Sequence, residues 1–195
     1  ELELSNKKID LNKPFLRHNY MDLLNNAVNE DLTNFQLEDL IVLCEKLKIK
    51  LESKPTLGRI YDVLMRELVE PNLIEPTFVL NYPKIISPLA KISREGNKNI
   101  VERFELFVGG DEIANAFSEL NDPIDQKARF DDQLAAKEAG YEETHEMDED
   151  FIESLNIGMP PTGGLGIGID RIVMLLTNQA SIRDVLFFPH MKTKE

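Results

Sequence analysis

The sequence predicts an α+β fold in which a mixed, mostly antiparallel β-sheet is flanked by helices. Two segments alternate apolar and polar residues on either side of a short turn, as the strands of β-hairpins do. Two others repeat apolar residues at the three- and four-residue spacing of a helix. With 195 residues, 42% of them hydrophobic, the chain is long enough to bury a core, most simply as one domain.

The first predicted elements are a hairpin and two helices. Residues 1–4 and 9–11 alternate around a turn at 5–8. One helix covers residues 37–47, and its apolar face is traced by Leu37, Leu40, Ile41, Cys44 and Leu47. A second helix begins after Thr56 and ends before Pro71, with Leu57, Ile60, Leu64 and Leu68 on one face.

The longest predicted hairpin covers residues 101–120. Apolar and polar residues alternate from Arg103 to Val108, and Gly109-Gly110 supplies a two-residue turn. The period of two places Asn115, Phe117 and Glu119 on one face of the returning strand. An amide, an aromatic ring and a carboxylate in one row indicate a binding site, although a solvent-facing strand remains an alternative.

Two further helices are predicted near the C-terminal end of the chain. Asp122-Pro123 is typical of an N-cap followed by proline at the first helical position, and the helix is expected to end at Gly140. A shorter helix around Ile152 is closed by Gly158.

A glycine-rich segment then runs into an apolar helix. Its glycines, Gly163, Gly164, Gly166 and Gly168, let another group approach the backbone closely, although tight backbone packing alone would also explain them. The apolar residues expected to be buried around it are Ile167, Ile169, Ile172, Val173, Leu175 and Leu176. Arg171 stands at the start of the helix, where the dipole disfavours a cation and burial without a partner is costly. We therefore expect Arg171 to have an anionic or aromatic partner.

Composition excludes several classes of protein. The net charge of −13 argues against a broad nucleic-acid-binding surface. No apolar run reaches the roughly 20 residues of a membrane span, and nothing resembles a signal peptide. The single cysteine, Cys44, fits a core position in a reducing, cytoplasmic protein. The three histidines lack the spacing of metal ligands.

The segment GGLGIGIDRIVMLLTNQASIRDVLFFP, residues 163–189, resembles the third signature motif of class II aminoacyl-tRNA synthetases, in particular the lysyl-tRNA synthetases. Residues 104–123 are similar to their stretch that binds the amino acid and metal, and residues 57–60 and 75–90 fit the same family. The resemblance covers essentially the whole chain. It implies a partial catalytic domain of the class II synthetase type.

The resemblance also implies roles for individual residues. Glu105 and Glu112 would hold Mg²⁺ against the phosphates of ATP. Arg171 would be the catalytic arginine, stacked on adenine and near phosphate oxygens. The residues implied in ATP binding are Glu105, Glu112, Gly164, Gly166, Gly168 and Arg171.

The lysine pocket implied by the resemblance lies on the returning strand of the hairpin. Glu119 can pair with the ε-ammonium group, Asn115 can accept a hydrogen bond from it, and Phe117 can cover the methylene stem. These assignments raise a geometric difficulty. Strict alternation puts Glu112 and Asn115 on opposite faces, whereas one site needs both, so we predict a β-bulge between them.

The resemblance further implies that residues 1–195 are the C-terminal portion of a catalytic domain. Motifs 1 and 2 and the anticodon-binding domain, which grips much of the tRNA, would be absent, and the chain alone is expected to be inactive. The longer protein would be a homodimer acting on lysine, ATP and tRNA(Lys), without a membrane or DNA partner.

Three alternatives to this reading stay open. A lysyltransferase paralogue that modifies a protein also resembles this region. A non-catalytic interaction module would be indicated by loss of Glu105, Glu112 or Arg171, and all three are present. The aspartate or asparagine branch would need cationic or amide recognition where this chain has Glu119.

Overall fold

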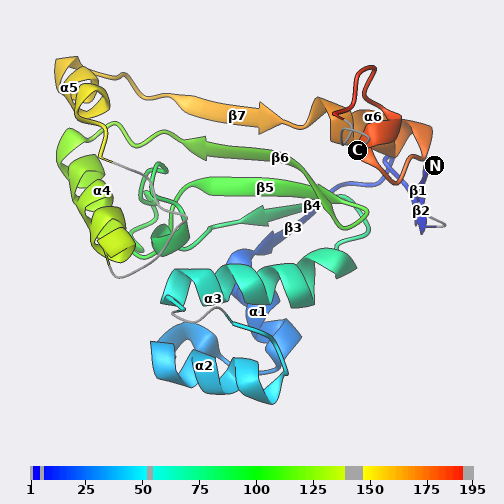
Figure 1. The fold of residues 1–195 in the computed structure, drawn as a ribbon, viewed down its shortest axis with the longest axis horizontal. Helices are drawn as coiled ribbons and strands as arrows, with labels where there is room; N and C mark the ends of the chain where they lie inside the picture. Colours follow the sequence, from blue (N-terminus) through cyan, green and yellow to red (C-terminus); the bar gives the residue numbers. More distant parts are fainter. Residues whose placement is uncertain (1, 5–6, 52–54, 139–146, 191–195) are drawn as a thin grey trace, which may run out of the picture.

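The computed structural model describes residues 2–4, 7–51, 55–138 and 147–190, and most of its strands lie in one sheet (Figure 1). Within these residues the sheet contains β3 (Leu16–Asn19), β4 (Thr77–Leu80), β5 (Arg103–Val108), β6 (Asp111–Ser118) and β7 (Gly163–Ile167), in that order. β3 pairs in parallel with β4, and every other pair is antiparallel. The predicted mixed, mostly antiparallel sheet is therefore confirmed.

Helices surround this sheet on three sides (Figure 1). Near β3 lie α1 (Tyr20–Val28), α2 (Leu37–Lys46) and α3 (Leu57–Leu64), with the 3₁₀ turn η1 (Leu32–Asn34). One end of the strands carries α4 (Pro123–Glu138) and α5 (Glu149–Ile157). At the other end, α6 (Ile169–Thr177) lies beside the hairpin of β1 (Leu2–Leu4) and β2 (Lys7–Ile9).

The predicted N-terminal hairpin is confirmed, with Leu2 opposite Ile9. Its second strand starts at Lys7, two residues earlier than expected, and turn residues 5–6 lie outside the described residues. The helix after Thr56 is also confirmed, because the Thr56 hydroxyl accepts a hydrogen bond from the Arg59 backbone N–H at 3.1 Å.

The end of that helix differs from the prediction. The α-helical geometry stops at Leu64. The backbone then forms a π-helical turn, η2 (Met65–Val69), and a 3₁₀ turn, η3 (Glu70–Asn72). Pro71 is tolerated there because the first positions of a helical turn do not need an N–H donor. Further 3₁₀ turns occur as η4 (Lys84–Ile86) and η5 (Ile182–Asp184).

The caps of α4 and α5 follow the sequence. A carboxylate oxygen of Asp122 accepts from the backbone N–H groups of Ile124, at 2.9 Å, and Asp125, at 3.3 Å. α5 ends at Gly158, whose φ of 130° is a conformation that favours glycine. The predicted end of α4 at Gly140 lies outside the described residues.

The main core lies between α1–α3 and the sheet. Its fully or nearly fully buried members include Tyr20, Leu24, Leu40, Cys44, Ile60, Leu64, Val79 and Phe107. Cys44 occupies the predicted core position, and burial raises the pKa of its thiol. This core covers β4 and β5 and leaves the same face of β6 and β7 more open.

The predicted burial around the glycine-rich segment is wrong for most of its residues. Leu175 is 7% exposed and Ile172 is partly buried, but Ile167, Ile169, Val173 and Leu176 are exposed, Ile169 by 66%. The reason is that β7 is the last strand of the sheet within the described residues, where one face of α6 packs against Ile9, Val108 and Ile113. Among the described helices, none combines the length and apolarity needed to cross a bilayer.

Candidate active site

The turn between β5 and β6 sets the register of the site. Gly109 and Gly110 have φ values of 71° and 93°, so both adopt the positive φ that a two-residue hairpin turn needs. Val108 pairs with Asp111 and Phe107 with Glu112. The predicted two-residue turn is therefore confirmed.

A β-bulge follows directly after this turn. Leu106 pairs with Ala114, so Ile113 is an extra residue on β6, and Glu105 then pairs with Asn115. The extra residue brings Glu112 and Asn115 to the same face of the sheet, as predicted. Ile113 is buried against Ile9, Val108 and Leu175, which fixes the bulge in the second, smaller core.

The candidate site spans three neighbouring strands. Gly166 on β7 pairs with Asn115, so one row across the face contains Glu105, Asn115 and Gly166. The next row contains Arg103, Phe117 and Gly164. Side chains therefore line β5 and β6, whereas the adjacent part of β7 offers only backbone on this face.

Glu119 places its carboxylate directly over Gly164. A Cβ atom added at residue 164 would lie only 2.0 Å from Glu119 Oε1. Partial burial raises the pKa of the Glu119 carboxyl, and within the described residues this carboxylate has no hydrogen-bond or ion-pair partner. A partly desolvated, unpaired carboxylate favours a cationic ligand.

Glu105 is held on both of its oxygens. Arg103 Nη2 donates to Oε1 at 2.6 Å, and the Tyr82 hydroxyl donates to Oε2 at 2.6 Å. Burial, followed by the Glu105 charge, raises the pKa of Tyr82 well above its usual value, so the hydroxyl keeps its proton and remains a donor. The carboxylate is thus fixed in one orientation.

Arg103 also fixes the Asn115 amide. Its Nε donates to Asn115 Oδ1 at 3.2 Å. A guanidinium group can only donate, so the amide must turn its oxygen to Arg103 and present its nitrogen to a ligand. This arrangement makes the amide nitrogen available as a donor, whereas the acceptor role expected from the sequence would use the second lone pair of the oxygen.

Sequence reasoning did not identify Arg103 or Tyr82 as site residues. For Arg103 a signal exists, because it precedes Glu105 by two residues and so shares its strand face. Tyr82 lies in an irregular segment after β4 and is brought to Glu105 only by the tertiary fold.

Arg171 has the anionic partner that the sequence predicted. Its Nη1 donates to the backbone oxygen of Glu112 and lies 3.4 Å from Glu112 Oε2. The Arg171 side chain folds against Gly168, where an added Cβ would approach its Cδ to 3.4 Å. Both side chains remain partly exposed, so a ligand can reach the guanidinium.

The carboxylates on β5 and β6 suit a divalent cation that is shared with a second ligand. No group of three or more His, Cys, Asp or Glu residues able to hold a metal occurs in the described part of the chain. Mg²⁺ typically takes one or two protein carboxylates and completes its shell with phosphate oxygens and water. Glu105 and Glu112 fit that pattern, because each carboxylate oxygen has two lone pairs and can accept beyond its present contacts.

The pKa of a third carboxyl group, that of Glu70, is affected by the negative charge of this region. Burial, followed by the charges of Glu105 and Glu112, raises the pKa of Glu70 from 4.5 to about 7. Glu70 is positioned by the hairpin turn, since Gly110 N–H donates to Leu73 O at 3.0 Å and the backbone of residue 70 lies close to Gly110. A cation at Glu105 and Glu112 would relieve this repulsion.

Comparisons with known proteins agree with the resemblance seen in the sequence. The family model described as class II tRNA synthetases (D, K and N) matches residues 1–192. The chain is similar to proteins named lysine–tRNA ligase: 52% identical over 187 residues to that of Mycoplasma mobile, 50% over 188 residues to that of Thermoanaerobacter pseudethanolicus, and 51% over 187 residues to that of Staphylococcus saprophyticus. These matches cover 95–96% of the chain but 38% of each relative.

We expect Glu70→Gln to stabilise the protein at about pH 8 but not at about pH 4. Between the ordinary pKa of 4.5 and the folded value of about 7, the folded protein retains a proton that the unfolded chain has released. Wild-type stability therefore falls as the pH rises through this interval, and the loss is complete above it. Because Glu70 is only half-buried, the gain is about 1 kcal/mol, measurable by urea denaturation.

Glu67→Gln is the matched control, because Glu67 is exposed in the preceding turn. An equal gain at high pH in this control would show that general relief of negative charge, and not the position of Glu70, is responsible.

Proposed function

We propose, since this chain belongs to the class II tRNA synthetases (D, K and N), that the protein containing it activates lysine with ATP and transfers it to tRNA(Lys). The observation that carries the proposal is the unpaired, partly buried Glu119 carboxylate over Gly164. An acidic group in that position suits lysine and disfavours aspartate.

The lysine pocket would use three side chains of one strand face. Glu119 pairs with the ε-ammonium group, and Phe117 covers the methylene stem. Asn115 donates its amide hydrogens to an acceptor such as the lysine carboxylate, because its oxygen is turned toward Arg103. The amino acid would thereby lie along β6, with one end near Glu105 and the other at Glu119.

ATP would bind over the glycines of β7 beside Arg171. Gly164, Gly166 and Gly168 leave room for the adenosine, and the planar Arg171 guanidinium can stack on adenine while donating to a phosphate. Glu105 and Glu112 would hold Mg²⁺ against the phosphates. When bound, this ion supplies positive charge that offsets the negative charge of the phosphoryl oxygens.

The proposed reaction requires the protein mainly to position the reactants and to stabilise charge. The lysine carboxylate attacks the α-phosphorus of ATP, and pyrophosphate leaves to give lysyl-adenylate. The lysyl group is then passed to a ribose hydroxyl of the tRNA, and AMP leaves. Asn115 and Glu119 hold the nucleophile in place, and Arg171 stabilises charge on the phosphate. The chain's residues thus act by orientation and electrostatics.

We further propose that residues 1–195 form the C-terminal part of the catalytic domain of a homodimeric, cytoplasmic enzyme. The chain spans 38% of the length of the relatives it matches, which supports a longer protein. Its charge of −13 is consistent with tRNA being held largely elsewhere. The buried, unpaired Cys44 is consistent with a reducing compartment.

Lysine-dependent exchange of pyrophosphate into ATP by the full-length protein tests this proposal. We expect lysine to support exchange, and aspartate and asparagine to fail. Transfer assays with tRNA and with candidate protein acceptors then separate a synthetase from a protein lysyltransferase. Exchange driven by aspartate or asparagine, or by no amino acid, would overturn the proposal.

Glu119→Gln should weaken lysine binding by roughly 30-fold or more, because removing one member of a desolvated ion pair costs about 2–5 kcal/mol. ATP binding should change little. The advantage of lysine over the uncharged isostere norleucine should shrink strongly in the variant. Binding of both ligands to wild type and variant measures the effect, and an unchanged preference would show that another group recognises the ammonium.

Gly164→Ala should displace the Glu119 carboxylate, because the new Cβ would lie 2.0 Å from its oxygen. We expect lysine binding to weaken about tenfold or more, with the fold retained. Gly163→Ala is the control, since its Cβ would meet only the Phe117 backbone oxygen at 4.0 Å. Calorimetric titration of lysine into both variants decides the outcome, and equal losses would contradict the assigned contact.

Glu112→Gln should raise the Mg²⁺ concentration needed for adenylation and lower its rate by about tenfold, while lysine binding stays near wild type. Glutamine keeps an acceptor for Arg171 but removes the charge that a metal requires. Asp111→Asn, at an exposed neighbouring position, is the control. Unchanged Mg²⁺ dependence in Glu112→Gln would mark this carboxylate as structural.

A further inference from the structure

We propose that Arg129 and Arg103 are positioning residues that act in series, through the loop of residues 86–90, to orient Asn115 and Glu105. Arg129 fixes the loop, the loop fixes Arg103, and Arg103 fixes the two site residues. The effect of this relay on catalysis rests on the proposed function. The geometric part of the inference concerns this chain alone.

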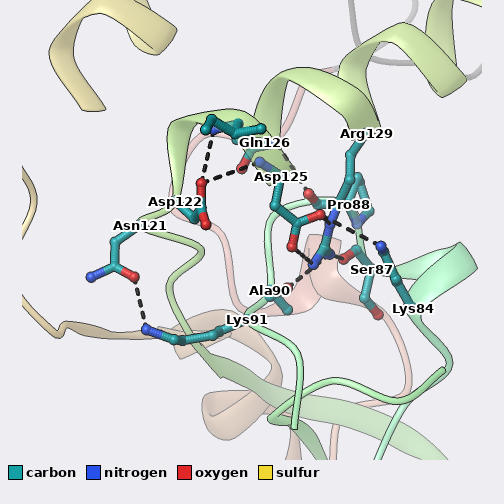
Figure 2. Close-up of polar contacts among 11 residues, drawn as sticks. Lys84, Ser87, Pro88, Ala90, Lys91, Asn121, Asp122, Asp125, Gln126 and Arg129 are labelled. Carbon is teal, nitrogen blue, oxygen red and sulfur yellow. Dashed lines mark hydrogen bonds and ion pairs between the residues drawn. The ribbon is translucent and has the colours of Figure 1, made fainter. Parts of the chain in front are cut away.

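The first step is the hold of α4 on the loop, shown in Figure 2. Arg129 is 4% exposed, and its Nη1 donates to Ser87 O at 3.0 Å and Ala90 O at 2.8 Å. Gln126 lies on the same helix, nearer to its start. Its side chain is fully buried and donates from Nε2 to Pro88 O at 3.1 Å. Two side chains of one helix therefore hold three carbonyl groups of one short loop.

The Arg129 guanidinium is itself held rigidly. Its Nε and Nη2 donate to the two carboxylate oxygens of Asp125, at 3.1 and 2.9 Å, one helical turn earlier (Figure 2). These hydrogen bonds lower the pKa of Asp125, so the pair stays charged. A bidentate pair fixes the plane of the guanidinium and hence the direction in which Nη1 points.

The second step leads from the loop to Arg103. Arg103 Nη1 donates to Ile86 O at 3.0 Å and to Ser87 Oγ at 2.9 Å. The guanidinium lies over the Tyr82 ring, with 4.5 Å from its carbon to the ring centroid. Ser87 thus contacts both arginines, offering its carbonyl to Arg129 and its hydroxyl to Arg103.

The third step is the hold of Arg103 on the site. Its Nε donates to Asn115 Oδ1 at 3.2 Å and its Nη2 to Glu105 Oε1 at 2.6 Å. All three nitrogens of the guanidinium are therefore committed, and the group cannot turn without breaking contacts on both sides. A shift of the loop would move Arg103 and, with it, the Asn115 amide and the Glu105 carboxylate.

Ala90, at the end of the loop, pairs with the Glu119 backbone, but neither arginine contacts the Glu119 side chain in the described structure. This separation gives the proposal a signature. A change at Arg103, which contacts residues 86 and 87 but not Ala90, should alter functions of Asn115 and Glu105 while sparing recognition of the ammonium group. A general loss of folding would alter all of them together.

The test is a double-mutant cycle in the full-length ligase with Arg129→Gln, Arg103→Gln and both. Calorimetry measures Mg²⁺-dependent ATP binding without turnover, and exchange assays give the KM for lysine. We expect each single variant to weaken ATP binding and to raise the KM for lysine, each by about tenfold. In Arg103→Gln the ratio of lysine to norleucine binding should stay unchanged. Because the arginines act in series, the double variant should be no worse than Arg103→Gln.

Two further variants keep the test decisive. Ser87→Ala removes only the hydroxyl link to Arg103 and should give a smaller loss of the same kind, even if Arg129→Gln folds poorly. Arg94→Gln removes an equally bidentate but exposed pair with Glu102 and should leave both measurements unchanged.

Losses that multiply in the double variant, or a changed lysine-to-norleucine ratio in Arg103→Gln, would overturn the relay. A crystal structure of Arg129→Gln decides the geometric part without any activity. Intact Arg103 contacts to residues 86 and 87 there would refute it, and their loss would support it. Absence of lysine-dependent exchange in the wild type would instead count against the proposed function.

Discussion

The register of the β5–β6 pair is the constraint on which the whole site depends. One extra residue, Ile113, turns the rest of β6 over, so that Asn115 and Phe117 share a face with Glu112. Because β7 pairs with β6, the position of β7 also depends on this register. The bulge is stabilised because Ile113 is buried with Ile9 and Leu175, so Ile9 of the N-terminal hairpin supports a site that is built on other strands.

Charge in the site is unevenly compensated, and the imbalance explains which ligands it favours. Arg103 and Arg171 contact Glu105 and Glu112, whereas Glu119 has no partner among the described residues. Partial desolvation makes each unmatched negative charge costly, so a cation is stabilised wherever it can reach one. A polyanion such as ATP fits only when positive charge accompanies it.

Local signals in the sequence predicted the elements well. The Gly109-Gly110 turn and the Thr56 and Asp122 caps depend on residues adjacent in the chain. The bulge could be predicted because the resemblance places Glu112 and Asn115 in one site, whereas strict alternation along a strand would put them on opposite faces. The parallel β3–β4 pair was not, since it joins two four-residue strands that are far apart in sequence. Burial along α6 was overestimated because periodicity identifies an apolar face but does not show what covers it.

The apolar edge at β7 also affects how the chain behaves in concentrated solution. Leu165 is 61% exposed, Ile167 lies beside it on the same strand, and within the described residues no strand pairs with the outer edge of β7. Such an edge is a template for adding a strand from another molecule. Mutual repulsion between chains of net charge −13 opposes that contact. Colloidal stability of the chain therefore depends on ionic strength, because salt screens the repulsion but leaves the backbone edge and its apolar side chains unchanged.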